Sequence, residues 1–285
     1  MRDHEHKHNE EPQMTETAIR KQKMRAEVLR HETLAPGIRS LELRVPELPA
    51  AARPGQFVGV YTGDGAMLLP RPISICDSGD EKELRLVYRV AGKGTAEIAG
   101  LKAGEETQIL GILGNGYPVE ELKNKRVLLL GGGIGIPPML LLAKQLSALS
   151  NGEEKEQSPV ITVLGYRDAQ MFLREEFEKY AQVFIATEDG SVGTKGNVLT
   201  AVKEEGIRAD AICACGPMPM LRAVKAYAAQ EGIACYISLE ERMACGVGAC
   251  LGCVAKTTRE DEHSHVKNTR ICTEGQVFDA EYVDI

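Results

Sequence analysis

The sequence lacks any apolar stretch long enough to cross a membrane. Its longest apolar run lies near residues 134–142 beside several glycines, whereas a membrane-spanning helix needs about 20 apolar residues. Basic residues form no stripe, and the 285-residue chain carries a formal net charge of −7, so we expect no nucleic-acid partner. The first residues have no apolar segment behind a basic start, so they are not a secretory signal. We therefore expect a cytoplasmic protein that binds neither a membrane nor nucleic acid.

The sequence also lacks a motif for a catalytic nucleophile, and we expect no catalytic acid, base or nucleophile in this chain. It does contain eight cysteines. In a cytoplasmic protein of this size, that number favours metal or redox chemistry over disulfides, because the cytosol keeps thiols reduced.

The first half of the chain divides into a tail and a strand-rich domain. Residues 1–22 are polar and aperiodic, which predicts a disordered tail in which His4, His6 and His8 are solvated. Residues 23–122 show short strand patterns separated by Gly and Pro, which favours a small antiparallel barrel. The strands expected there include residues 57–61, 73–76, 83–90 and 107–113.

The second half of the chain has a different secondary-structure pattern. Residues 123–233 alternate between strand and helix patterns, which predicts a parallel sheet covered on both faces. The expected strands are 126–130, 160–165, 183–187 and 211–215, and the expected helices are 137–149, 171–180 and 217–230. Residues 234–285 are rich in cysteine and glycine. A segment with so small a hydrophobic core needs a bound metal to stabilise its fold. The predicted fold is thus multidomain: an antiparallel β-barrel, an α/β domain with a parallel sheet and a small C-terminal metal domain.

Four cysteines of the last part have the spacing of a plant-type [2Fe–2S] site. Four residues separate Cys245 from Cys250, two separate Cys250 from Cys253, and eighteen separate Cys253 from Cys272. Three close ligands and a distant fourth are typical of such clusters, and the glycines between the first three allow the loop to wrap around one. A structural zinc site is the alternative, although zinc sites usually use two short paired knuckles.

The other four cysteines lie in strand-like runs. Cys76, Cys213 and Cys235 have apolar neighbours and are expected to be inert core residues. Cys215 ends a predicted strand just before Gly216, a position that suits either a core residue or a residue facing a ligand.

A glycine-rich turn joins a predicted strand to a predicted helix in the α/β domain. It reads Gly-Gly-Gly-Ile-Gly-Ile-Pro-Pro over residues 131–138, and it departs from the usual dinucleotide fingerprint because the third glycine is replaced. The backbone N–H groups of such a turn and the helix start can hold a pyrophosphate. A tight turn without a ligand is the alternative.

Several motifs, taken in sequence order, resemble the ferredoxin–NAD(P)+ reductase superfamily over about residues 24–232. They are Arg-Pro-Ile-Ser at 71–74, Val-Tyr-Arg at 87–89, Gly-Lys-Gly-Thr at 92–95, the glycine turn and Cys-Gly-Pro-Met at 215–218. The run Leu-Glu-Glu-Arg-Met-Ala-Cys-Gly-Val-Gly-Ala-Cys over 239–250 narrows the resemblance to the electron-transfer subunits of class 1B dihydroorotate dehydrogenases. With this run, the resemblance spans nearly everything beyond the tail.

The resemblance implies three cofactors, which are FAD in the barrel domain, NAD in the α/β domain and a [2Fe–2S] cluster in the C-terminal domain. Arg71 would lie on the FAD phosphates and Ser74 near the flavin ring. The residues implied for FAD are Arg71, Pro72, Ile73, Ser74, Val87, Tyr88, Arg89, Gly94 and Thr95. Those implied for NAD are Gly131, Gly132, Gly133, Gly135, Cys215, Gly216, Pro217 and Met218. Those implied for the cluster are Cys245, Cys250, Cys253 and Cys272.

The same resemblance implies a partner. This is a separate FMN-containing catalytic subunit that oxidises dihydroorotate to orotate in pyrimidine biosynthesis, assembled with this chain as a heterotetramer of two of each. Electrons would pass from that FMN through the cluster and FAD to NAD+. Val247 and Leu251 are candidates for an apolar contact with the partner, or for local core. Glu240 and Glu241 are expected to be solvated, and contact with the flavin edge or with the partner is the alternative.

Other functions stay open at this point. A sulfide dehydrogenase or a ferredoxin:NADP+ transhydrogenase would use the same cofactors, and a redox-sensing module would bind them without turnover. The segment at 165–168 does not decide between NAD and NADP, because Arg167 suits a 2′-phosphate whereas Asp168 repels one.

Overall fold

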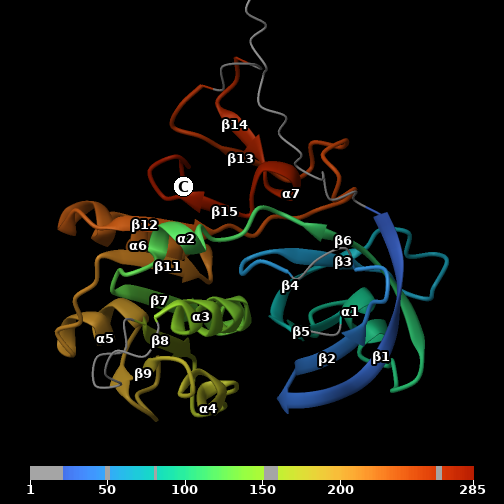
Figure 1. Ribbon diagram of the computed structural model, residues 1–285, viewed down its shortest axis with the longest axis horizontal. Helices are drawn as coiled ribbons and strands as arrows, with labels where there is room; N and C mark the ends of the chain where they lie inside the picture. The colour runs from blue at the N-terminus through green and yellow to red at the C-terminus, as the bar shows by residue number, and fades with distance from the viewer. Residues whose placement is uncertain (1–21, 49–51, 80–81, 151–159, 261–264) are drawn as a thin grey trace, which may run out of the picture.

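The computed structural model of the protein describes residues 22–48, 52–79, 82–150, 160–260 and 265–285. The predicted tail, with His4, His6 and His8, lies outside these residues except for Gln22, which begins the first strand. The described chain forms a β-barrel, a largely parallel sheet with helices on both faces, and a small C-terminal unit above the line where the two meet (Figure 1). The predicted multidomain fold is confirmed. Within the described ranges, no helix is long and apolar enough to cross a membrane.

The barrel contains six antiparallel strands in the closed order β1-β2-β5-β4-β3-β6. The strands are β1 (Gln22–Ala35), β2 (Ile38–Arg44), β3 (Phe57–Val60), β4 (Arg71–Ser78), β5 (Glu83–Arg89) and β6 (Glu106–Leu113), and the short helix α1 (Lys93–Ile98) follows β5. Met24, Ala26 and Val28 of β1 are at most 1% exposed, whereas the residues between them are more exposed. This period of two is what a strand needs to bury one face inside a barrel.

The sheet has the order β10-β9-β8-β7-β11-β12-β15, and only β15 runs antiparallel to its neighbour. Its strands are β7 (Val127–Gly132), β8 (Val160–Tyr166), β9 (Gln182–Thr187), β10 (Thr194–Lys195), β11 (Ala211–Cys215), β12 (Ala234–Ser238) and β15 (Val277–Asp279). The helices around it are α2 (Val119–Leu122), α3 (Pro137–Leu149), α4 (Arg174–Phe177), α5 (Val198–Glu204) and α6 (Met218–Glu231).

Successive residues of β7 pack into different cores, which is why the whole strand is buried. Val127 and Leu129 belong to the cluster that contains α3 and α4. Leu128 and Leu130 belong to the cluster that contains α5 and α6. A continuous apolar strand of this kind is typical of a parallel sheet covered on both faces.

The structure differs from the sequence-based expectation at α4. A helix was expected over residues 171–180, but α4 contains only Arg174–Phe177. Leu173, directly before it, has a left-handed backbone with φ 67°. Phe172 and Leu173 are both buried, so the chain enters a turn here that places two consecutive apolar side chains in the core. The sequence analysis also missed α5, whose first turn is capped by the Asn197 side chain.

The sheet extends past residue 233, where the sequence analysis placed a domain boundary. β12 pairs in parallel with β11, and β15 adds to the far side of β12. The chain between these two strands forms the C-terminal unit, which contains the hairpin β13 (Val254–Lys256) and β14 (Asn268–Arg270) and the helix α7 (Ile271–Glu274). The C-terminal unit is therefore an insertion held at both ends by the sheet.

Helix α3 lies between the sheet and the barrel (Figure 1). Leu141 is 2% exposed and packs into the barrel core, while Met139 and Leu140 pack on the sheet side. At the edge of this contact, Lys144 Nζ lies 3.0 Å from the carboxylate of Asp77 on β4. One helix thus fixes the barrel against the sheet.

We predict that Leu141→Ala lowers the free energy of unfolding by about 2–5 kcal/mol, because it leaves a cavity where α3 enters the barrel core. Urea denaturation of the full chain measures this change. Leu149→Ala is the matched control, since Leu149 ends the same helix and is only partly buried. An equal loss of stability in both variants would contradict the conclusion that Leu141 anchors α3 in the barrel core.

Candidate functional site

A cavity of about 490 Å³ lies between the barrel and the sheet. This volume is within the range of cofactor sites. Of the residues expected to bind FAD, those that line it are Pro72, Ile73, Ser74, Val87, Tyr88, Arg89 and Thr95. Burial raises the pKa of Tyr88 to about 12, so its hydroxyl stays protonated and uncharged. The structure thus brings three separate barrel motifs to one wall.

Arg71 and Gly94 lie beside this cavity rather than in its lining. A Cβ on Gly94 would fall 2.1 Å from Arg71 Nε, so the guanidinium needs the space that glycine leaves. Arg71 Nη1 donates to the carbonyl oxygen of Leu69 at 2.5 Å. The Thr95 hydroxyl accepts from the backbone N–H of Gly92 at 3.1 Å and so shapes the start of α1. A guanidinium held over a glycine at a short helix is a suitable donor for phosphate oxygens.

The glycine turn forms the opposite wall. Gly132, Gly133 and Gly135 line the cavity with Cys215, Gly216 and Pro217. A Cβ on Gly135 would meet the carbonyl oxygen of Cys215 at 2.3 Å, so the turn and the end of β11 approach each other more closely than other residues allow. Gly131 and Met218 do not line the cavity. Burial raises the pKa of Cys215 to about 12, so this side chain is a neutral thiol in the wall.

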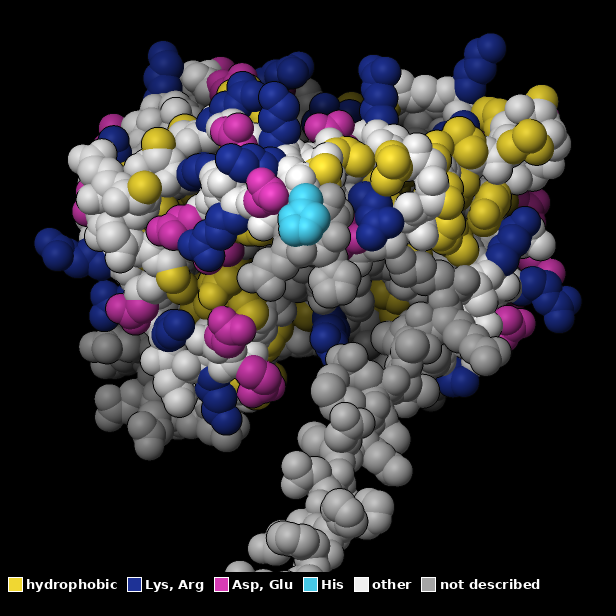
Figure 2. Space-filling view, turned by 90° about the horizontal axis from the view of Figure 1, so that it is seen from above, with side chains coloured by type: hydrophobic (Ala, Val, Ile, Leu, Met, Phe, Trp, Pro, Cys, Tyr) yellow, Lys and Arg dark blue, Asp and Glu magenta, His cyan; other side chains and the backbone are white. Residues whose placement is uncertain are grey.

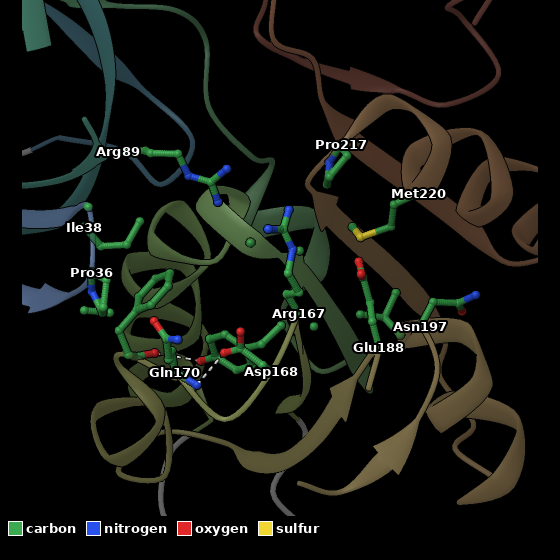
Figure 3. A pocket seen from close by; sticks show the side chains of 18 of the residues that line it. Pro36, Ile38, Arg89, Arg167, Asp168, Gln170, Glu188, Asn197, Pro217 and Met220 are labelled. Carbon is green, nitrogen blue, oxygen red and sulfur yellow. Dashed lines mark hydrogen bonds between the residues drawn. The ribbon is translucent and has the colours of Figure 1, made fainter. Parts of the chain in front are cut away.

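A second cavity of about 530 Å³ lies at the carboxyl ends of β7, β8 and β9 (Figure 3). Ligands of open parallel sheets bind at this edge. Figure 3 shows Arg89 from the barrel and Arg167 from the sheet extending toward the same space, with Glu188 facing it. The Asp168 carboxylate accepts from the backbone N–H of Gln170 at 2.8 Å.

The two cavities share a wall. Arg89, Gly132, Gly133 and Pro217 line both. A ligand in one cavity therefore lies next to a ligand in the other, as transfer between two bound cofactors requires.

Sequence reasoning missed several of the lining residues. Glu188, Asn197 and Met220 line the second cavity, and Glu188 was the easiest to find, since it directly follows a correctly predicted strand. The first cavity is also lined by residues that end or follow β12 or that precede β15: Ser238, Leu239, Glu240, Glu241, Met243 and Gln276. Glu240 and Glu241 are exposed, as expected, but they stand at the rim of this cavity.

The four cysteines of the predicted cluster lie in the C-terminal unit as two pairs. Cys245 Sγ accepts from the backbone N–H of Cys250 at 3.4 Å, while Cys253 and Cys272 contact each other through their side chains. In the described part of the chain, no three His, Cys, Asp or Glu side chains converge as a single-ion site would require. Two thiol pairs suit a centre with two irons, each holding two thiolates, better than they suit one tetrahedral zinc.

The loop that carries Cys245, Cys250 and Cys253, here called the cysteine loop, turns backbone N–H groups toward sulfur. The Sγ of Cys245 also accepts from the N–H of Val247 at 3.4 Å, and the Sγ of Cys250 accepts from the N–H of Gly252 at 3.4 Å. These backbone donors, Val247 first, lower the pKa of Cys245 to about 6. Donors of this kind stabilise thiolate ligands and cluster sulfides, so the donor set fits an iron–sulfur cluster.

The other cysteines lie apart from these pairs. Cys76, Cys213 and Cys235 are buried, as predicted. Burial is also the main cause that raises the pKa of Cys76 and of Cys213 well above the ordinary thiol value. They are structural residues.

Comparison with known proteins adds the family. Residues 240–284 match the model of the iron–sulfur cluster binding domain of dihydroorotate dehydrogenase B, and residues 129–226 match the oxidoreductase NAD-binding domain. An electron transfer subunit of dihydroorotate dehydrogenase B (NAD(+)) from Fusobacterium nucleatum is 41% identical over 240 residues, covering 81% of this chain and 87% of that protein.

This chain belongs to that family of electron transfer subunits.

A second family member, from Geobacillus sp. (strain WCH70), is 39% identical and covers 89% of this chain and 95% of its own length. The predicted resemblance to the dihydroorotate dehydrogenase electron transfer subunits is thereby confirmed. The family name also indicates that members work with a second, catalytic subunit.

Solved structures agree with the fold of this family. A chain of the NADH-dependent reduced ferredoxin–NADP oxidoreductase superposes with a TM-score of 0.77 and 27% identity, over 91% of this chain and 89% of that one. Phthalate dioxygenase reductase, described as a modular structure for electron transfer from pyridine nucleotides to [2Fe–2S], superposes with a TM-score of 0.58 and 17% identity, over 92% and 98%.

We predict that Gly94→Ala weakens FAD binding at least about tenfold, because its Cβ displaces the Arg71 guanidinium and so removes charge-assisted hydrogen bonds. Titration of the FAD-free full chain with FAD measures the dissociation constant. Gly92→Ala is the matched control, since a Cβ on Gly92 meets no atom within 4 Å. Equal affinities of Gly94→Ala and the wild type would contradict the role given to Arg71.

Proposed function

We propose that this chain is the electron transfer subunit of an NAD+-linked dihydroorotate dehydrogenase. The observation that carries the proposal is the contiguity of the three sites. Two cavities share a wall, and Met243 lines the first cavity only two residues before Cys245. The net reaction of the assembly oxidises dihydroorotate to orotate and reduces NAD+ to NADH, with release of one proton.

The residues have distinct roles in this proposal. When bound, FAD supplies both two-electron and one-electron chemistry, and the [2Fe–2S] cluster supplies one-electron chemistry. Arg71 would hold the FAD phosphates, and Ser74 would lie near the flavin ring. Gly132, Gly133 and Pro217 line both cavities, so they would hold the nicotinamide next to the flavin. Hydride transfer needs no protein acid or base, so position and shielding are what the chain provides.

The second cavity favours NAD+ over NADP+. Asp168 and Glu188 both line it at strand ends, where an acidic side chain binds ribose hydroxyls and repels a 2′-phosphate. Arg167 and Arg89 also line this cavity, so the net charge does not decide between the two cofactors. The position of the two carboxylates at strand ends supports NAD+, and the names of the relatives contain NAD(+) as well.

The partner in this proposal is an FMN-containing catalytic subunit, joined with this chain as a heterotetramer of two of each in the cytoplasm. Val247 is 42% exposed and Leu251 is 63% exposed, and both belong to the cysteine loop. Figure 2 looks down on the C-terminal unit and shows hydrophobic side chains gathered on the barrel side of this face. Exposed apolar groups beside a redox centre suit a surface across which electrons leave or enter.

The first test is cofactor analysis of the full chain purified without oxygen. We expect flavin bands, about two irons with acid-labile sulfide per chain, and bleaching by NADH in preference to NADPH. Cys250→Ser and Cys253→Ser should lose the iron, whereas Cys235→Ser, which changes a buried core cysteine, should keep it. Zinc in place of iron, or a chain that binds no flavin, would refute the proposal.

We also predict that Leu251→Asp weakens binding of the catalytic subunit about tenfold or more, as loss of a central apolar contact does. Leu251 has φ 56°, a conformation that Asp tolerates, so the iron content should not change. Val266→Asp is the control, because it places the same charge on an exposed apolar residue (41% exposed) at the far end of the β13–β14 hairpin. Equal binding by both variants would show that the cysteine loop is not the contact.

A second candidate function is that of a subunit of a ferredoxin–NADP oxidoreductase, which the 27% identical structure favours. Activity distinguishes the two. Reduction of NAD+ by dihydroorotate once the catalytic subunit is added supports the first function. Reduction of NADP+ by reduced ferredoxin supports the second.

A further inference from the structure

A buried glutamine joins the segment that carries the cysteines to the wall of the first cavity, here called the flavin cavity because it is the proposed FAD site. Gln276 follows Cys272 by four residues and is 6% exposed. Its Nε2 donates to the carbonyl oxygen of Gly55 at 2.7 Å and to Ser74 Oγ at 3.2 Å. Gln276 and Ser74 both line the first cavity.

The chemistry of these two contacts fixes the orientation of the amide. A backbone carbonyl only accepts hydrogen bonds, so the atom that faces Gly55 must be the NH2 group of Gln276. The second hydrogen of the same nitrogen serves Ser74, whose oxygen therefore accepts. The Ser74 hydroxyl keeps its own hydrogen for another group, and it has no acceptor among the described residues.

The backbone holds Gln276 firmly in this place. Its carbonyl oxygen accepts from the N–H of Leu239 at 2.8 Å. The next residue, Val277, begins β15, pairs with Ser238 and donates its N–H to Asn115 Oδ1 at 3.1 Å. The amide therefore reaches Ser74 from the residue directly before a strand of the sheet, rather than from a loose segment.

We propose that Gln276 is a positioning residue that directs the Ser74 hydroxyl to donate a hydrogen bond into the flavin cavity. The acceptor is a ring nitrogen or carbonyl oxygen of the bound flavin. The inference rests on the proposed FAD site and deepens it, because it gives the segment after the last cluster ligand an influence on the flavin by way of Ser74. Gln276 acts through Ser74 and not on the flavin itself.

Two substitutions of Gln276 test this direction of donation. Gln276→Leu removes the donor, whereas Gln276→Glu places a carboxylate there, which only accepts and would take the Ser74 hydrogen. The readouts are the FAD dissociation constant of the full-length chain and the midpoint potential of its flavin. We expect affinity to fall about three- to tenfold in each variant, the range of one ordinary hydrogen bond, and the potential to shift in the same direction as in Ser74→Ala.

A double variant separates positioning from a merely structural role. If Gln276 acts through Ser74, the potential shifts of Ser74→Ala and Gln276→Leu do not add in the double variant. Gln56→Leu is the matched control. Gln56 is also buried, 7% exposed, and donates to the carbonyl oxygen of Gly114 at 2.9 Å, but it does not line the cavity. Its loss should leave the flavin potential unchanged.

Three results would overturn the inference while FAD still binds. They are a Gln276→Leu potential equal to that of the wild type, additive shifts in the double variant, or the same shift in Gln56→Leu. A wild-type chain that binds no FAD at all would overturn the proposed function together with this inference.

Discussion

The packing of helix α3 between the barrel and the sheet is the contact on which both cavities depend. Leu141 enters the barrel core, while the residues just before it pack with the sheet. At the edge of this contact, Arg85 of the barrel forms a bidentate ion pair with Glu176 of α4, with Nη2 and Oε1 3.0 Å apart. Apolar burial by α3 and this ion pair together hold the barrel against the sheet, and the cavities are the space that remains between them.

Close backbone approach brings the glycine turn against the end of β11, next to the residues that line both cavities. Gly135 lies against the carbonyl of Cys215, and Gly132 lies against the Met220 side chain, where a Cβ would meet sulfur at 2.6 Å. Larger side chains at these positions would separate the turn from β11. The neutral thiol of Cys215 adds no charge to this place.

The C-terminal unit stays close to the two cavities because the chain connects it to the sheet at both of its ends. β12 enters it from the sheet and β15 returns to the sheet, so the cysteine loop cannot move far from the flavin cavity. Gly246 packs on the barrel strand β6, where a Cβ would lie 3.3 Å from Leu113. This short tether matters because electron transfer between two centres requires a small and constant distance.

The sequence by itself determined whatever depends on local pattern. The helix at 137–149 was predicted at its observed bounds, because its apolar periodicity and its proline start are local properties. The cysteine spacing likewise indicated a two-iron site, since ligand spacing within a loop is a property of the chain. The motif around Arg71 and Ser74 was assigned to FAD only through the family resemblance, because the tetrapeptide alone also fits an ordinary strand start.

Only the tertiary structure decided which distant segments meet. Gln276 reaches Ser74 across 202 positions of sequence, and no local signal marks a glutamine as the partner of a serine so far away. The turn at Leu173 was missed because burial of two adjacent side chains outweighed helix propensity. Glu188 joined the second cavity because parallel strands end at one edge, and the position of that edge depends on strand order, which arises from packing.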